Sequence, residues 1–391
     1  MLFTKHRAKV LSALLFIVIL MNSARYFFKF GAPSSSSGYT DTPIEFWAAR
    51  YFLVGLVFLV FASYWRRFRL FELIAFGVLA VSSIYALTIT ESKLVKIAAF
   101  HLCLAGLLFL TARSMEDDIA EHLTENFTKL LYALAVIFAS FLVLQVFLYF
   151  GFDVLPAHSH GNSIIVRFGS VLDDSLAFGV LLPMFAGLLF YSLEDEFSRS
   201  VSLMAVILMA VLTGSLTAMA TTAIYTLWLV RLKWRNFALW VLLISLLLAS
   251  FHWYFIELWS AKSGSIAGHL DGLQLLSGST SGGASGNIDA QFQSRGFAES
   301  GWILLFKNFG MFALIVMLSF HLYIHFLCSS MLRSAFNRKQ YVGAVEGLNF
   351  SALVASFNLP VLMIFPVYFL LAIFSAVLCG LAGKNGIGLK S

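Results

Sequence analysis

Residues 200–231 read SVSLMAVILMAVLTGSLTAMATTAIYTLWLVR, two apolar runs separated by Thr213-Gly214-Ser215. Because these three residue types interrupt helical patterns, the stretch predicts two short helices, 200–214 and 216–231. Each would be only about 22 Å long at 1.5 Å per residue, against a hydrocarbon layer of ~30 Å. A single tilted helix is the alternative. The choice decides the topology, since removing one crossing would move the flanking loops to opposite sides of a membrane.

The composition is that of a membrane protein. Of the 391 residues, 60% are hydrophobic and only 12% are charged, whereas a soluble domain carries about 25% charged residues. Most of the surface must therefore face lipid, which predicts an all-α, polytopic transmembrane helical bundle forming a single integral membrane domain, 1–391. The net charge of +6 is then read as loop charge, and no nucleic-acid partner is expected.

The three cysteines indicate neither a disulfide nor a metal site. Cys103, Cys328 and Cys379 all lie in apolar segments, so no disulfide pattern and no cysteine pair with metal-ligand spacing is predicted. We therefore expect no metal and no other cofactor.

Apolar runs and the breaks between them predict about twelve crossings, with a large outer (periplasmic) loop, 259–301, between the ninth and tenth. The predicted crossings are 10–29, 46–65, 70–89, 95–112, 129–152, 171–192, 200–214, 216–231, 237–258, 302–328, 343–358 and 361–382.

The distribution of Lys and Arg orients this arrangement. With both termini cytoplasmic, 17 of the 26 basic residues fall in cytoplasmic segments, where membrane proteins retain them. A single helix over 200–231 would instead put Arg231, Lys233 and Arg235 outside. Two crossings are therefore favoured, and they place the connections 153–170 and 259–301 on the same outer face.

Arg167 precedes the sixth predicted crossing, in the stretch Arg167-Phe168-Gly169. An arginine at a membrane boundary presents five fixed donors suited to phosphate or carboxylate. Asp173 and Asp174 follow close to the bilayer, where charge is costly and often functional. The plainer interpretation is that Arg167 pairs with one aspartate while the other caps a helix.

The large outer loop contains Lys262, His269 and Asp271. A histidine near a carboxylate can act as a general base near neutral pH, although a loop histidine is more often merely solvated. Farther along the loop, residues 278–287 are rich in Gly and Ser. Such a stretch can turn backbone N–H groups toward an anion or serve as a flexible linker.

Arg295 and Glu299 lie just before the tenth predicted crossing. Glu299 could position a hydroxyl or orient His269, or it could simply complement the dipole of the following helix. His321 and His325, four residues apart, share one helix face but lack the glutamate of a zinc-protease helix. We interpret these two histidines as interfacial.

Taken together, these segments resemble the O-antigen polymerase and ligase superfamily (Wzy-like and WaaL-like proteins). The resemblance covers about residues 165–325 and depends on four motifs in a fixed order. They are Arg167-Phe168-Gly169 with Asp173-Asp174-Ser175, then Leu212-Thr213-Gly214-Ser215, then Ser265 to His269 with Gly282-Gly283-Ala284-Ser285-Gly286, and finally Glu299-Ser300-Gly301-Trp302 with Asn308-Phe309-Gly310.

Two departures from the family pattern stand out. Many members have Arg directly after the Thr-Gly-Ser motif, where this chain has Leu216, and a proline or asparagine near the acidic pair. The histidine followed by Glu-Ser looks most like exopolysaccharide and capsule repeat-unit polymerases.

The resemblance implies an enzyme of the bacterial inner membrane that transfers oligosaccharide from undecaprenyl pyrophosphate at the outer face. It works without metal and inverts the anomeric centre. Arg167, Arg295 and Lys262 would bind the pyrophosphate, and His269 would serve the acceptor hydroxyl with help from Asp271 or Glu299. Implied partners are the lipid-linked oligosaccharide, membrane lipid, and a chain-length regulator or other polysaccharide assembly proteins.

Three alternatives stay open. A ligase would pass finished glycan to another acceptor. A lipid-linked glycan flippase or secondary transporter should show repeat symmetry and polar residues at mid-membrane depth, and no internal repeat is found. An exosortase-like protease needs a nucleophilic cysteine near the outer face, which the positions of the three cysteines argue against.

Overall fold

The computed structural model describes most of the predicted helices but few of the connections. The described residues are 2–21, 44–62, 70–89, 93–113, 117–152, 168–170, 172, 175–230, 300–334, 337–357, 361 and 367–384, with isolated positions at 242, 245, 249 and 256. All statements below concern these residues.

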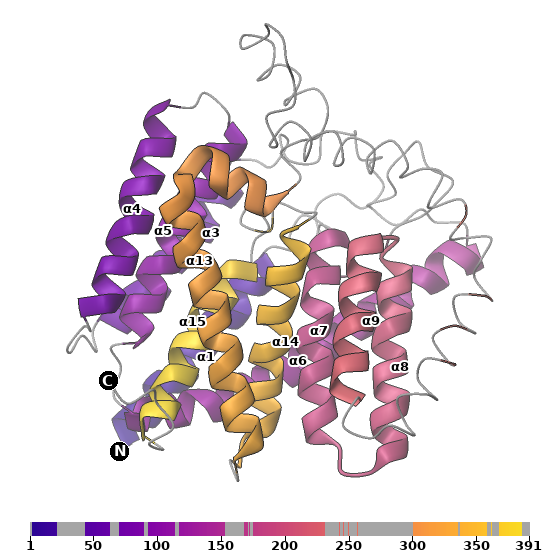
Figure 1. Cartoon of the computed structure of the whole chain (residues 1–391). Helices are drawn as coiled ribbons and strands as arrows, with labels where there is room; N and C mark the ends of the chain where they lie inside the picture. The colour runs from indigo at the N-terminus through magenta and orange to yellow at the C-terminus, as the bar shows by residue number, and fades with distance from the viewer. Residues whose placement is uncertain are drawn as a thin grey trace, which may run out of the picture.

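The described part is all-α, as predicted, and it contains eleven helices and no strand (Figure 1). The helices are α1 (Leu2–Met21), α3 (Ile44–Ala62), α4 (Leu70–Ile89), α5 (Lys93–Arg113), α6 (Asp117–Phe152), α7 (Ser175–Ser192), α8 (Glu196–Leu212), α9 (Leu216–Val230), α13 (Gly301–Arg333), α14 (Lys339–Ala355) and α15 (Val367–Lys384).

Four helices are long and apolar enough to cross a membrane, namely those within 70–89, 95–113, 119–152 and 301–333. A helical membrane protein is thus supported, but the described part does not contain the predicted twelve crossings. Length is one reason: α9 has 15 residues, or about 22 Å, which falls short of a ~30 Å layer. The predicted crossing 237–258 lies almost entirely outside the described residues.

Of the helix boundaries, the starts of two helices differ most from the prediction. α6 begins at Asp117 rather than near 129, because Ile119, Leu123 and Phe127 face the protein core and extend the helix by three turns. α1 begins at Leu2 rather than near residue 10. Both extensions contain charged residues, so apolar runs alone do not predict them.

The prediction of two helices within 200–231 is confirmed. α8 ends at Leu212, and α9 begins at Leu216 after a turn in which Gly214 has a φ of 60°. At the other end of α8, the Asp195 carboxylate accepts a hydrogen bond from the Ser198 N–H at 2.7 Å. α7, α8 and α9 therefore stand side by side, each antiparallel to the next along the chain (Figure 1).

α14 packs against α7 with almost no side chain between them. A Cβ atom added at Gly347 would lie 2.0 Å from the carbonyl oxygen of Pro183, and one at Gly187 would lie 2.0 Å from that of Gly343. Small residues allow helix backbones to approach this closely in membranes. From α9, the Tyr225 hydroxyl donates to the Gly343 carbonyl at 3.0 Å. These contacts fix three helices against one another at the centre of the core.

The α7–α14 contact also fixes a register. Since Pro183 faces Gly347 and Gly187 faces Gly343, the two helices run antiparallel. Ser175 precedes Pro183 by eight residues, and Ala355 follows Gly347 by eight. The start of α7 is therefore level with the end of α14.

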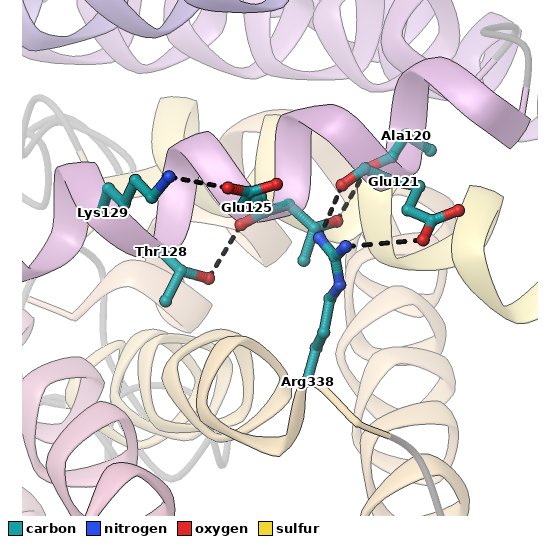
Figure 2. A network of polar contacts seen from close by, with 7 residues as sticks. Ala120, Glu121, Glu125, Thr128, Lys129 and Arg338 are labelled. Carbon is teal, nitrogen blue, oxygen red and sulfur yellow. Dashed lines mark hydrogen bonds and ion pairs between the residues drawn. The ribbon is translucent and has the colours of Figure 1, made fainter.

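At the opposite end of the bundle, Arg338 links the start of α14 to α6 (Figure 2). Its guanidinium donates to the Glu121 carbonyl at 2.7 Å and lies 3.5 Å from the Glu121 carboxylate. Lys129 and Glu125 form a further pair on α6 at 2.6 Å, in which both side chains are exposed. Exposed pairs of this kind contribute little, so the contact with the backbone carbonyl is the more important link.

The close approach of α7 and α14 yields a stability prediction. Gly347→Ala should push a methyl group into the Pro183 carbonyl and lower the free energy of unfolding by about 1–3 kcal/mol, as overpacking does. The thermal midpoint of the detergent-purified protein measures this. Gly77→Ala is the matched control, since its Cβ would meet nothing within 4 Å and alanine favours a helix. Equal midpoints for the two variants would contradict the proposed tight contact.

Candidate functional site

The short segment Phe168–Ser170 is held by hydrogen bonds from two helices. The Phe168 N–H donates to the Leu212 carbonyl at 3.1 Å, at the end of α8. On α6, the Gln145 side chain accepts from the Ser170 N–H at 2.9 Å and donates to the Ser170 carbonyl at 3.0 Å. The Ser170 hydroxyl donates to the Phe138 carbonyl at 2.5 Å. The segment that follows Arg167 is thereby fixed beside the Thr213–Ser215 turn.

Ser170 adopts a strained backbone conformation. Its φ is 56°, in the left-handed region that residues other than glycine seldom occupy. Such strain persists only where surrounding contacts impose it, and here the Gln145 side chain and the Phe138 carbonyl do so. Backbone strain of this kind clusters at functional sites.

The start of α13 is bound to the end of α14. Ser300 caps α13 and its hydroxyl also lies 3.4 Å from the Ser356 carbonyl, to which the Trp302 N–H donates at 3.2 Å. The Trp302 indole N–H donates to the Leu353 carbonyl at 3.1 Å. The backbone N–H and the indole N–H of Trp302 therefore both attach the start of α13 to the end of α14.

These segments lie at one end of the bundle. The α7–α14 register puts the start of α7 level with Ala355, and a Cβ at Gly179 would touch Ala218 near the start of α9. We call this end the junction and define it as Phe168–Ser170, Thr213–Ser215, Ser300–Trp302 and Ser356. It unites described parts of three of the four motifs that carry the family resemblance.

A polar group is buried directly beside the junction. His321 Nδ1 lies 2.7 Å from the Asn349 side-chain oxygen, and His321 Nε2 lies 3.0 Å from the Tyr368 hydroxyl. The Trp302 ring meets the His321 ring edge-on, with centroids 5.7 Å apart. The interpretation of His321 as interfacial was wrong, because its side chain is 0% exposed. The signal that could have found the group is the presence of Asn349 and Tyr368 in otherwise apolar segments.

A second polar pair lies farther from the junction. His325 Nδ1 is 3.4 Å from a carboxylate oxygen of Glu346, and the His325 side chain is 40% exposed whereas that of Glu346 is 1% exposed. For His325, therefore, a position at the protein surface is consistent with the interfacial interpretation. A buried carboxylate inside an apolar helix of a membrane protein is itself a functional indicator.

The predicted site residues lie outside the described part of the chain. The structure does describe the neighbours of two of them, Phe168 after Arg167 and Ser300 after Glu299, and both belong to the junction. The roles of the predicted residues stay predictions: His269, Glu299 and Asp271 in catalysis, and Arg167, Arg295 and Lys262 in pyrophosphate binding. Asp173 and Asp174 are likewise not described.

Within the described residues, no group of three or more His, Cys, Asp and Glu side chains could hold a metal ion. No protein-family model and no curated protein matches the chain. The family resemblance therefore stays a prediction from the four motifs.

The Gln145 clamp on Ser170 can be tested directly. Gln145→Leu should leave the buried N–H and C=O of Ser170 unpaired, at a cost of about 1–3 kcal/mol for each group, and lower the thermal midpoint in detergent. Gln340→Leu makes the same chemical change on a half-buried side chain at the other end of the bundle. A midpoint drop no larger than that of the control would show that the clamp does not hold the segment.

Proposed function

We propose that this chain is a membrane glycosyltransferase that polymerises undecaprenyl-pyrophosphate-linked oligosaccharide repeat units at the outer face of a bacterial inner membrane, in surface polysaccharide or exopolysaccharide biosynthesis. The observation that carries the proposal is the junction. Sequence motifs separated by more than one hundred residues, Phe168–Gly169 and Ser300–Trp302, lie at the same end of the bundle as Thr213–Ser215.

The reaction requires two things of the protein: positive charge to stabilise the leaving pyrophosphate, and one general base for the acceptor hydroxyl. The acceptor hydroxyl oxygen forms a bond to the anomeric carbon while the bond from that carbon to the pyrophosphate oxygen breaks, so direct displacement inverts the centre. Undecaprenyl pyrophosphate leaves with the electron pair, and its charge is stabilised by Arg167, Arg295 and Lys262. His269 takes the hydroxyl proton, with Asp271 or Glu299 orienting its ring.

The proposed topology has twelve crossings and cytoplasmic termini, with the junction on the outer side. Described basic residues support this orientation. Arg199 near the start of α8, Arg333 at the end of α13 and Arg338 before α14 all lie at the end opposite to the junction. Because cytoplasmic segments retain Lys and Arg, that end fits the cytoplasmic side.

Within the same chemistry, an O-antigen ligase-type enzyme is the alternative, since the described residues carry no feature that selects the acceptor. A different function, transport of lipid-linked glycan, is favoured by one observation, the buried Glu346 beside His325 within the helices. Ionisable residues at depth mark substrate or proton paths in transporters.

Single substitutions Arg167→Ala, His269→Ala and Glu299→Ala test the proposal in cells. Each should abolish long glycan and cause single repeat units to accumulate on the lipid carrier, because the pyrophosphate loses its cation or the acceptor its base. Lys129→Ala is the control, as this exposed residue lies on α6 and is paired with Glu125 of the same helix. Carrier lipids extracted from the membrane and resolved by mass give the measurement.

The other outcomes identify the alternatives. Long polymer that stays on the carrier would indicate a ligase. Single repeats confined to the inner leaflet, together with the same defect in Glu346→Gln, would indicate a transporter. Normal glycan in all three variants would rule out the proposed site.

A further inference from the structure

The buried group of His321, Asn349 and Tyr368 has a fixed pattern of donors and acceptors. The Asn349 side-chain N–H donates to the His321 carbonyl at 3.0 Å, which turns its oxygen toward His321 Nδ1. A neutral His321 must then carry its proton on Nδ1, and Nε2 accepts from the Tyr368 hydroxyl at 3.0 Å. The group joins α13, α14 and α15 without any net charge.

α13 is folded back on itself above this group. Trp302 and His321 are nineteen residues apart and would be about 28 Å apart along a straight helix, yet their ring centroids are separated by 5.7 Å. The bend occurs at Gly310, where φ is 84° and ψ is 171°, a conformation that essentially only glycine adopts. The bend near the start of α13 is visible in Figure 1.

The segment before the bend is held by the burial of Leu304, Leu305 and Phe309 and by hydrogen bonds from Trp302. Its Trp302 indole donates to Leu353, one turn of α14 beyond Asn349, and its backbone N–H donates to Ser356 in the next turn. The His321 ring supports the Trp302 ring from the other side. His321 thus links the body of α13 to the folded-back segment that begins at Ser300.

We propose that His321 is a positioning residue, which together with Asn349 and Tyr368 holds the start of α13 against the end of α14 and so holds the segment that enters from Glu299. The inference rests on the proposed function. His321 never meets substrate, since its side chain is fully buried. It acts through Trp302, and its loss frees the folded-back segment to pivot at Gly310.

A cross-link between two introduced cysteines offers a test that separates positioning from general stability. The Ser300 hydroxyl lies 3.4 Å from the Ser356 backbone carbonyl, whereas the Ser356 hydroxyl donates to the Ala352 carbonyl at 2.6 Å. The two residues are adjacent, so cysteines in the double variant Ser300→Cys and Ser356→Cys should be joined by a short bifunctional thiol reagent. Adding His321→Leu should slow the cross-linking by about tenfold, as expected from two lost buried hydrogen bonds. Thiol labelling of the denatured protein measures cross-linking without reference to activity, and the protein with only its native cysteines sets the baseline.

The same variants are then assayed for long glycan. His321→Leu alone should lower the glycan yield by about tenfold, and the preformed cross-link should restore it. Tyr368→Phe, which removes one hydroxyl, gives a smaller version of both effects if His321→Leu fails to fold. Tyr323→Phe is its control, since it makes the same change in a tyrosine on α13 whose hydroxyl accepts from the Cys379 thiol at 3.8 Å rather than from the His321 group.

Equal cross-linking rates with and without His321 would overturn the proposal, whatever the enzyme does. Loss of glycan that the cross-link fails to restore would also overturn it, because His321 would then act by another route. A failure of the proposed function appears separately, as normal glycan in Arg167→Ala, His269→Ala and Glu299→Ala while the cross-linking difference persists.

Discussion

The structure depends first on the contact between the backbones of α7 and α14. With Gly187 against Gly343 and Gly347 against Pro183, the two helices meet carbonyl to Cα. In lipid the hydrophobic effect does not drive helices together, so dispersion and the fit of small residues must do so. The Tyr225 hydroxyl of α9 donates to the Gly343 carbonyl at 3.0 Å and so ties this contact to one register. The register in turn sets the start of α7 level with the end of α14, and the junction follows from it.

The sequence predicted those features of the fold that depend on neighbouring residues, such as turns between helices. Thr213-Gly214-Ser215 marks the turn between α8 and α9, and the structure has it there, because a break within an apolar run needs residues that tolerate a turn. The early start of α6 was missed, since its first three turns mix charged residues with the buried Ile119 and Leu123. Apolar runs indicate helices that face lipid, whereas an amphipathic helix with charged residues on one face does not produce such a run.

The candidate site was less accessible to prediction than the fold. Spacing of four residues correctly put His321 and His325 on one helix, but it said nothing of depth, and His321 is buried while His325 is partly exposed. The partners of His321 lie 28 and 47 residues away in the chain, so only tertiary packing brings them together. The same holds for Gly310, because a φ of 84° inside a helical stretch is imposed by the docking of Trp302 rather than by its own neighbours in sequence.

The two buried polar groups differ in what they require of the surrounding helices. His321, Asn349 and Tyr368 hydrogen-bond to one another as neutral groups, so burying them among apolar helices costs little free energy. Their hydrogen bonds also fix how α13, α14 and α15 pack against one another. Glu346 and His325 pair across 3.4 Å with one member exposed, and a charge at that depth is costly unless a function retains it. The neutral group beside the junction is therefore suited to hold a geometry, whereas a buried carboxylate beside a histidine is the kind of group found on substrate or proton paths. A polymerase needs the first property, a transporter needs the second, and the position of the neutral group against Trp302 is what connects the membrane-embedded helices to the proposed chemistry.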